Sequence, residues 1–193
     1  MSDDRVNTEK AAAPQRLFYF NLGFAYQKTL RRIMQLSGHS LHFGLPQRGD
    51  GVVVWGNSPT AHRGQGVAAR RNLPLVRVED AFVRSIHPGR LGETPLGLMI
   101  DPIGVHYDAT RPSQLEQILA RDPLDDSVLL ARAAAGITRL RALDISKYNH
   151  HNAQPPKAGY VLVVDQTRGD AALMGADVVN FRAMLAAANC GRR

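Results

Sequence analysis

The amino-acid sequence predicts an α/β protein with a mainly parallel sheet. Apolar runs of strand length occur at residues 16–22, 51–56 and 74–80, and longer helix-like segments lie between and after them. Strands that alternate with helices along a chain are typical of a parallel sheet covered by helices. The chain has 193 residues, of which 44% are hydrophobic, so it is large enough to bury the core of such a sheet.

The individual elements follow from periodicity and from turn residues. Strands are expected at residues 16–22, 40–45, 51–56 and 74–80, and a hairpin at residues 96–101 and 105–108 around the turn 102–104. Helices are expected at residues 25–38, 59–71, 111–119 and 125–143. Gly38 ends the first of these helices, Pro112 lies in the first turn of the third, and Asp125 or Asp126 caps the fourth.

A polar, proline-bearing segment divides the chain. We expect a disordered tail at residues 1–15, an N-terminal Rossmann-like domain at 16–147 and a linker at 148–158. A second domain would begin at 159–193, with a strand at 160–166 and a helix at 176–188.

Composition narrows the class of protein. The net charge is +7, but the arginines are scattered and no nucleic-acid-binding motif is present, so we expect an anionic small ligand and no nucleic acid. The single cysteine, Cys190, excludes an internal disulfide and favours a reducing compartment. The polar start of the chain does not resemble a signal peptide, and no apolar run is long enough to span a bilayer. These features favour a cytoplasmic location.

Carboxylates follow two of the expected strands. Ligands of doubly wound sheets bind outside the carboxyl ends of the strands, and two carboxylates from different strands suit glycosyl transfer. The alternative is structural, with Glu79 capping a turn or paired to Arg84 and Asp170 in an ordinary loop. The candidate catalytic residues are Asp170, Glu79 and Asp80, and the candidate substrate-binding residues are Arg84, Ser85, Gln166, Arg168 and His87.

A glycine pattern suggests a different class of protein, a dinucleotide-binding enzyme. Residues 64–69 read GQGVAA, which matches a dinucleotide-binding fingerprint, with Glu79 in place to bind a ribose. An NAD-dependent oxidoreductase is therefore an alternative, although residues 57–63 separate the glycines from the preceding strand. The histidines have no zinc-site spacing, so no metal site is expected.

Five motifs occur in an order that resembles one family. VVVWGNSP, LVRVEDAFVRSIHPG, PLGLMIDPIGVHYDATRPSQLEQIL, SKYN and YVLVVDQTRGDAAL together resemble the capsule polysaccharide biosynthesis family of the KpsC/LipA type. Members of this family are retaining β-Kdo glycosyltransferases. The resemblance extends from about residue 18 to about residue 185.

The resemblance implies a GT-B-like fold, with one Rossmann-like domain and the first strand-helix unit of another. It implies CMP-Kdo as donor and a lipid-linked Kdo acceptor of the phosphatidylglycerol type. Asp170 would be the nucleophile and Glu79 the acid/base, with Asp80 as a weaker candidate, while Arg84 and Ser85 would line the site. CMP is a good leaving group, so the chemistry needs no metal and no cofactor is expected.

The sequence also departs from the family pattern. Ala81 stands where the family has glycine, and the chain ends where a second domain would continue. We therefore expect a truncated chain that does not transfer Kdo by itself. The alternative is a non-catalytic fragment that binds acceptor lipid or a capsule assembly or export protein, with peripheral contact at the inner face of the bacterial inner membrane.

Overall fold

The computed structural model describes residues 13–151, 154, 156–176 and 178–191, and their centre is a five-stranded sheet. The strands are β1 (Arg16–Tyr19), β2 (Ser40–His42), β3 (Gly51–Trp55), β4 (Leu75–Asp80) and β5 (Leu98–Asp101). They lie in the order β2-β1-β3-β4-β5. The first four pair in parallel and β5 runs antiparallel to β4, so the predicted α/β class with a mainly parallel sheet is confirmed.

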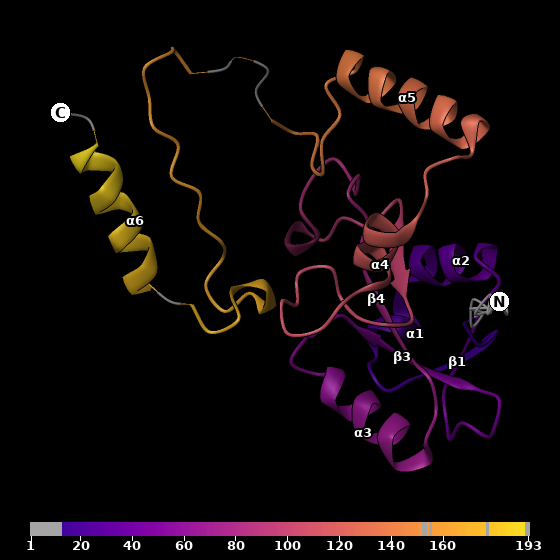
Figure 1. Cartoon of the computed structure of the whole chain (residues 1–193). Coiled ribbons are helices and arrows are strands. Elements are labelled where there is room, and N and C mark those ends of the chain that lie inside the picture. The colour runs from indigo at the N-terminus through magenta and orange to yellow at the C-terminus, as the bar shows by residue number, and fades with distance from the viewer. Residues whose placement is uncertain (1–12, 152–153, 155, 177, 192–193) are drawn as a thin grey trace, which may run out of the picture.

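Helices cover both faces of this sheet (Figure 1). The helices α1 (Gly23–Tyr26) and α2 (Lys28–Leu36) pack on one face, and α3 (Ala61–Arg71) packs on the other. The run of valines in β3 explains why both faces are apolar, since successive side chains of a strand point to opposite sides. Val53 joins the core under α2, whereas Val52 and Val54 join the core under α3.

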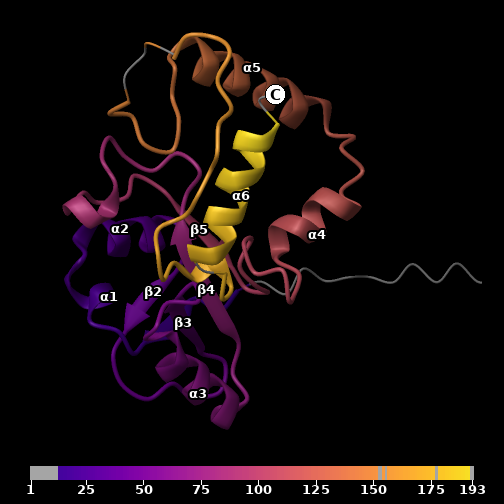
Figure 2. The same cartoon turned by 90° about the vertical axis from the view of Figure 1, so that its left-hand side faces the viewer.

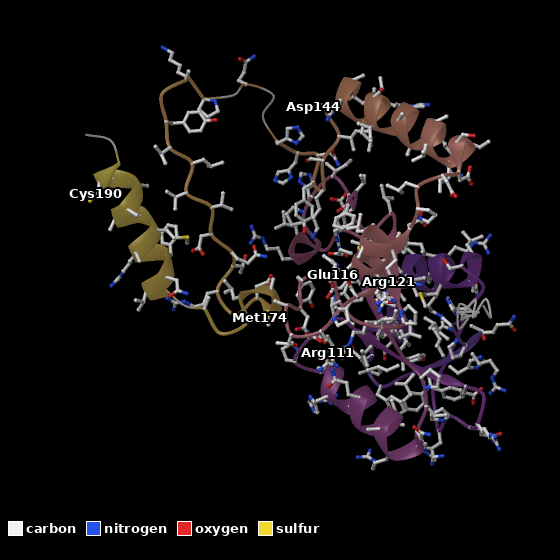
Figure 3. All side chains as sticks on the ribbon, viewed as in Figure 1. Arg111, Glu116, Arg121, Asp144, Met174 and Cys190 are labelled. Atoms are coloured by element: carbon white, nitrogen blue, oxygen red, sulfur yellow. The ribbon has the colours of Figure 1, made fainter. Side chains whose placement is uncertain are left out.

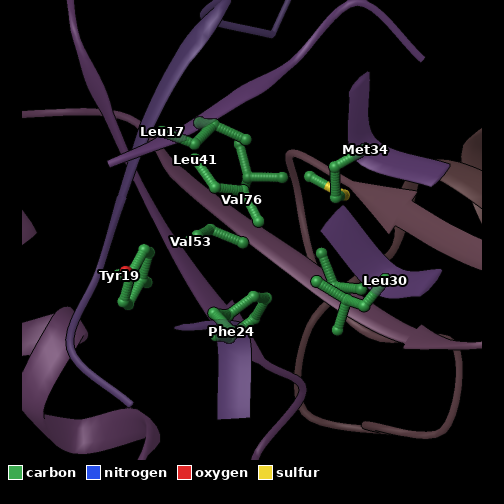
Figure 4. Packing of buried hydrophobic residues seen from close by; sticks show 9 residues of the cluster. Leu17, Tyr19, Phe24, Leu30, Met34, Leu41, Val53 and Val76 are labelled. Atoms are coloured by element: carbon green, nitrogen blue, oxygen red, sulfur yellow. The ribbon is translucent and has the colours of Figure 1, made fainter. Parts of the chain in front are cut away.

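The larger core lies under α1 and α2. Leu30 and Met34 of α2, four residues apart, are both almost fully buried against Val76 of β4 (Figure 4). Residues at that spacing share one face of a helix, which is the reason the sequence predicts this helix. The structure divides the expected helix at Gln27, the shared cap of α1 and α2, whose φ of −80° and ψ of 93° are extended.

The remaining helices lie outside the sheet. They are η1 (Gly89–Leu91), α4 (Gln114–Arg121), α5 (Ser127–Ala142), η2 (Ala171–Leu173) and α6 (Val178–Cys190). Ser113 forms a capping box with Glu116 at the start of α4, so Pro112 precedes the cap instead of lying in the first turn. Of the two candidate caps of α5, Asp126 is the one that accepts from the helix backbone.

The expected hairpin is wrong in its second strand. β5 is present, but residues 105–108 form a turn and not a strand. The carboxylate of Asp101 accepts hydrogen bonds from the backbone nitrogens of Ile103 (2.7 Å), Gly104 (2.9 Å) and Gln114 (2.8 Å). These bonds turn the chain towards α4, so it does not return along β5.

The expected strand at 160–166 is also wrong. These residues belong to no sheet in the described part of the chain, and most of their side chains are exposed. An apolar run becomes a strand only where another strand accepts its backbone hydrogen bonds, and the five-stranded sheet does not extend to this segment. The helix expected at 176–188 is confirmed as α6, which stands apart from the sheet in Figure 1.

Two expectations fall partly outside the described residues. Residues 1–12 of the expected tail are not among the described residues, and neither are residues 152, 153 and 155 of the expected linker. The division into domains at 147–159 stays a prediction. Among the described helices, none is long and apolar enough to cross a membrane.

Candidate functional site

The candidate site lies where β3 and β4 end. These parallel neighbours are in register, with Trp55 opposite Val78, so the residues that follow each strand meet at one edge of the sheet. Gly56 and Asn57 follow β3, and Glu79 and Asp80 close β4. The edge strand β5 lies on the far side of β4, with Met99 opposite Glu79. This is the edge at which doubly wound sheets bind ligands.

Glu79 is held by the loop that follows β5. The hydroxyl of Tyr107 donates to Glu79 Oε1 at 2.8 Å and accepts from the backbone nitrogen of Asn57 at 3.1 Å. The backbone nitrogen of Asp80 lies 3.4 Å from Glu79 Oε2. Tyr107 and the neighbouring Asp80 backbone therefore hold the Glu79 carboxyl group, and Asn57 in turn holds Tyr107.

Burial raises the pKa of Glu79 above its ordinary value of 4.5, and the nearby charge of Asp80 acts in the same direction. The hydrogen bonds from Tyr107 and from the Asp80 backbone lower the pKa, as does the charge of Lys147, but burial is the largest effect. A carboxyl group with a raised pKa keeps its proton to a higher pH than an ordinary glutamate does, which suits a general acid or base.

This raised pKa predicts a pH-dependent stability. Between pH 4.5 and the higher folded-state pKa of Glu79, the folded protein binds more protons than the unfolded chain, so its free energy of unfolding falls as pH rises. The Glu79→Gln variant has no such group. We expect the stability of the wild type relative to Glu79→Gln to decrease as pH rises through this window, measured by urea unfolding at several pH values. A constant or increasing difference would contradict the raised pKa.

Asp80 forms an ion pair with Arg84 in the loop that follows β4. Arg84 Nε lies 2.7 Å from Asp80 Oδ2, an ion pair whose N–H is not aligned for a hydrogen bond. The Arg84 side chain also donates to Ser85 Oγ at 2.8 Å and to the carbonyl of Glu93 at 3.1 Å. The alternative partner that the sequence suggested for Arg84 was Glu79, and the structure gives that place to Asp80.

Ser85 and His87 lie in the same loop. Ser85 Oγ donates to the carbonyl of His87 at 2.6 Å, and the backbone nitrogen of His87 donates to the Glu93 carboxylate. The His87 ring lies 5.0 Å, between centroids, from that of His150. Both polar residues therefore organise the loop after β4, with Ser85 buried and His87 exposed.

The segment 146–149, with sequence SKYN, clasps this loop. The carbonyl of Lys147 accepts from the backbone nitrogens of Arg84 (3.0 Å) and Ser85 (3.3 Å). The Asn149 side chain donates to the Ser85 carbonyl at 3.0 Å, and its backbone nitrogen donates to Ile86 at 2.8 Å. We call residues 146–149 the clasp. It returns the chain from α5 to the edge of the sheet where Glu79 lies.

Asp170 lies on the segment that follows the clasp. Its carboxylate accepts from the backbone nitrogen of Ala172 at 2.9 Å and so caps η2, a local role that the sequence left open. Burial is the main reason that the pKa of Tyr107 is raised, and the charges of Glu79 and then Asp170 add to the effect. The Asp170 side chain is exposed, and within the described residues no hydrogen bond joins it to Glu79 or Tyr107.

The figures agree with this placement. The short helix η2 passes beside the loop that joins β5 to α4 (Figures 1, 2 and 3). Gln166 and Arg168 are exposed, and within the described residues no hydrogen bond joins them to Glu79, Tyr107 or Asn57. The structure thus groups Glu79 with the loop after β4 and leaves these two side chains apart.

Three site residues were missed by reasoning from the sequence: Tyr107, Asn57 and Gly56. A tyrosine after an apolar segment looks like an ordinary core residue, and nothing in its spacing predicts a contact with Glu79. The available signal was the sequence around these residues. The polar segment NSP follows one expected strand, and GVHYD, which contains the tyrosine, follows another.

A small pocket adjoins Glu79. It is lined by Arg77, Glu79, Met99, Asp101, Gly104, Val105 and His106. Arg77 is buried, and its side chain donates to the Gly56 carbonyl at 2.5 Å. Burial lowers the pKa of Arg77, and the charge of Arg111 adds to this effect. The nearest guanidinium to Glu79 along β4 is thus committed to holding the turn after β3.

The dinucleotide-binding interpretation is wrong in its geometry. Gly64 and Gly66 lie inside α3, not in a turn between a strand and a helix. A Cβ atom on Gly64 would lie 2.5 Å from Val54 Cγ1, so this glycine lets α3 pack closely on β3. The described residues also contain no group of three or more His, Cys, Asp or Glu side chains that could hold a metal ion.

The fold and the site together define an α/β protein with a half-buried carboxyl group at the strand edge. Residues 50–158 match the model of a family described as capsule polysaccharide biosynthesis protein. This chain belongs to that family. The match includes β3, β4, Tyr107 and the clasp.

Curated relatives extend the similarity. The capsule polysaccharide modification protein LipA of Neisseria meningitidis serogroup A is 37% identical over 168 residues, which are 80% of this chain and 24% of LipA. The lipopolysaccharide-processing protein LpsZ of Rhizobium meliloti is 33% identical over 129 residues, or 63% of this chain and 29% of LpsZ. The chain thus spans about a quarter of the length of these relatives.

Two solved structures resemble this one. The β-Kdo 2,4-transferase of Thermosulfurimonas dismutans KpsC gives a TM-score of 0.72 at 30% identity, and the match covers 91% of this chain and 56% of that one. The β-Kdo 2,7-transferase of the same protein gives 0.55 at 28% identity, covering 83% and 51%. The fold of this chain is therefore GT-B-like, as the resemblance implied.

Proposed function

We propose that this chain supplies the acid/base and the nucleophile of a retaining β-Kdo glycosyltransferase in capsule polysaccharide biosynthesis. Glu79 is the acid/base and Asp170 the nucleophile, with Asp80, Arg84 and Ser85 organising the loop beside them. The donor is CMP-Kdo and the acceptor a lipid-linked Kdo, reached from the inner face of the membrane. The observation that supports the proposal most directly is the half-buried Glu79 carboxyl group, which accepts a hydrogen bond from Tyr107 at the edge of the sheet.

The reaction takes place in two displacements. An oxygen of the Asp170 carboxylate attacks the anomeric carbon of Kdo, and the bond from that carbon to the CMP phosphate oxygen breaks. A hydroxyl group of the acceptor then attacks the same carbon, its proton passes to Glu79, and the bond to Asp170 breaks. Two inversions give net retention. CMP leaves as an anion, so only the second step needs Glu79.

This order of steps predicts opposite effects for the two carboxylates. Because the isolated chain is not expected to transfer Kdo by itself, the test uses this sequence joined to the remaining domain of a full-length relative. With CMP-Kdo and acceptor present, we expect Glu79→Gln in that protein to slow the second step by roughly 10²–10⁴-fold and to accumulate a Kdo adduct on Asp170. We expect Asp170→Asn to form no adduct. The measurement is intact mass after acid quenching, followed by peptide mapping.

The control for this experiment is Asp165→Asn. Asp165 is an exposed carboxylate on the same segment, and we expect its variant to form the adduct as the wild type does. An adduct on another residue, an adduct in Asp170→Asn, or none in the wild type or in Glu79→Gln would contradict the proposal.

A further inference from the structure

Tyr107 has one hydroxyl proton, and the structure shows where it goes. The backbone nitrogen of Asn57 lies 3.1 Å from the Tyr107 oxygen and can only donate. The Tyr107 oxygen therefore accepts on that side, and its own proton is directed to Glu79 Oε1, 2.8 Å away. Glu79 Oε1 is thus committed as an acceptor whether or not the carboxyl group is protonated.

The position of Tyr107 is itself fixed by its neighbour. The Asn57 side chain donates to Asp108 Oδ2 at 3.1 Å, so one residue holds both Tyr107 and Asp108. The other oxygen of Asp108 accepts from the backbone nitrogen (3.0 Å) and the hydroxyl (2.5 Å) of Thr110. These bonds hold the loop that carries Tyr107, so the hydroxyl group needs little reorganisation to keep its direction.

Gly56 completes the enclosure. A Cβ atom built on Gly56 would lie 1.8 Å from Glu79 Oε1 and 2.6 Å from the Tyr107 oxygen. The pair of oxygens therefore occupies the space that any other residue would fill with its side chain. Oε1 faces this turn and the tyrosine, whereas Oε2 has a contact of 3.4 Å with the Asp80 backbone nitrogen. Oε2 is therefore the oxygen that can exchange a proton.

We propose that Tyr107 is a positioning residue that fixes the Glu79 carboxyl group so that Oε2 alone carries the exchangeable proton. This inference rests on the proposed role of Glu79. In the second displacement, the acceptor hydroxyl forms its bond to the anomeric carbon, the bond to Asp170 breaks, and the proton moves to Oε2. Tyr107 keeps its own proton throughout, consistent with the burial that raises its pKa.

The charged and titratable groups around Glu79 set the expected pH behaviour. Tyr107 lowers the Glu79 pKa by donating to the charged form, Lys147 lowers it by its charge, and Asp80 raises it. Removing the Tyr107 hydroxyl takes away one stabilising contact of the carboxylate while burial remains. The pKa of Glu79 should therefore rise further in Tyr107→Phe.

The test compares Tyr107→Phe with Tyr26→Phe in the full chain. Tyr26 is 77% exposed on α1, far along the sequence from the site, so its variant removes the same oxygen without touching Glu79. The first readout is the titration of the Glu79 side-chain carboxyl followed by carbon NMR. We expect an upward shift in Tyr107→Phe and none in Tyr26→Phe.

The second readout is the decay of the Kdo adduct, in this sequence joined to the remaining domain of a full-length relative, after acceptor is added. In Tyr107→Phe we expect roughly 10-fold to 100-fold slower decay, with the pH profile moved to higher pH and the acceptor concentration for half-maximal rate little changed. If Tyr107→Phe left the pKa of Glu79 unchanged, the inference would be overturned. It would also be overturned if the pKa shifted while the Kdo adduct decayed at the wild-type rate.

The two proposals fail separately. If Glu79→Gln clears the adduct at the wild-type rate, or if no adduct forms at all, the proposed function fails. The NMR titration still decides whether Tyr107 fixes Glu79, because it requires no turnover.

Discussion

Replacing Arg84 with methionine is expected to lower the free energy of unfolding by about 3 kcal/mol. The Arg84 side chain is 7% exposed and that of Asp80 is 21% exposed, so removing the guanidinium leaves a carboxylate largely buried without its charge partner. Asp80 Oδ1 is already buried with no hydrogen-bond partner among the described residues. Urea unfolding of the variant gives the measurement.

Two further variants separate this effect from a general loss of arginine. The double variant Arg84→Met/Asp80→Leu leaves no charge buried, so it should be more stable than Arg84→Met alone. Arg111 pairs with Asp108 at 3.7 Å, but its side chain is 58% exposed, and Arg111→Met should cost about 1 kcal/mol or less. Equal losses for Arg84→Met and Arg111→Met would show that burial of the first pair has no energetic consequence.

Replacing Gly56 with alanine is expected to destabilise the protein by about 3 kcal/mol and to displace the Glu79 carboxyl group. Gly56 has a φ of +37°, which is unfavourable for a residue with a Cβ atom. The new methyl group would also overlap Glu79 Oε1. We therefore expect this variant to lose the Tyr107–Glu79 hydrogen bond as well as stability.

The matched control is Gly66→Ala. Gly66 lies within α3, and the nearest atom to its Cβ position is the flexible end of Arg70 at 3.4 Å. Alanine favours a helix by about 1 kcal/mol relative to glycine, so this variant should be as stable as the wild type or more stable. Thermal unfolding of the two variants together checks the prediction, and a similar loss in both would contradict the overlap at Gly56.

The sequence predicted the strand ends of the site well because burial and polarity change there at the same point. In β4, Val76 and Val78 are fully buried, and Glu79 and Asp80 come directly after them. Such a boundary is local, so it can be recognised without knowing the fold. The same reasoning found Arg84, which lies four residues after Asp80 in the loop that follows β4.

The parts that could not be predicted depend on distant contacts. Residues 105–108 have the composition of a strand, but the hydrogen bonds of Asp101 turn the chain away from β5. Residues 160–166 are apolar enough for a strand, but no strand of the sheet lies beside them. Tyr107 meets Glu79 only because that turn exists. The assignment of roles to Glu79 and Asp170 rests on the family resemblance and stays a proposal.

The clasp has a further consequence, which concerns local concentration. Because residues 146–149 are bonded to the loop of Arg84 and Ser85, the residues of α4 and α5 add nothing to the length of chain that joins the edge of the sheet to Asp170. The tether that carries Asp170 begins at Asn149, beside the strand edge, and not at the far end of α5. A shorter tether raises the effective concentration of one group at another. Residues outside the proposed chemistry can therefore set how often the Asp170 carboxylate comes close to Glu79.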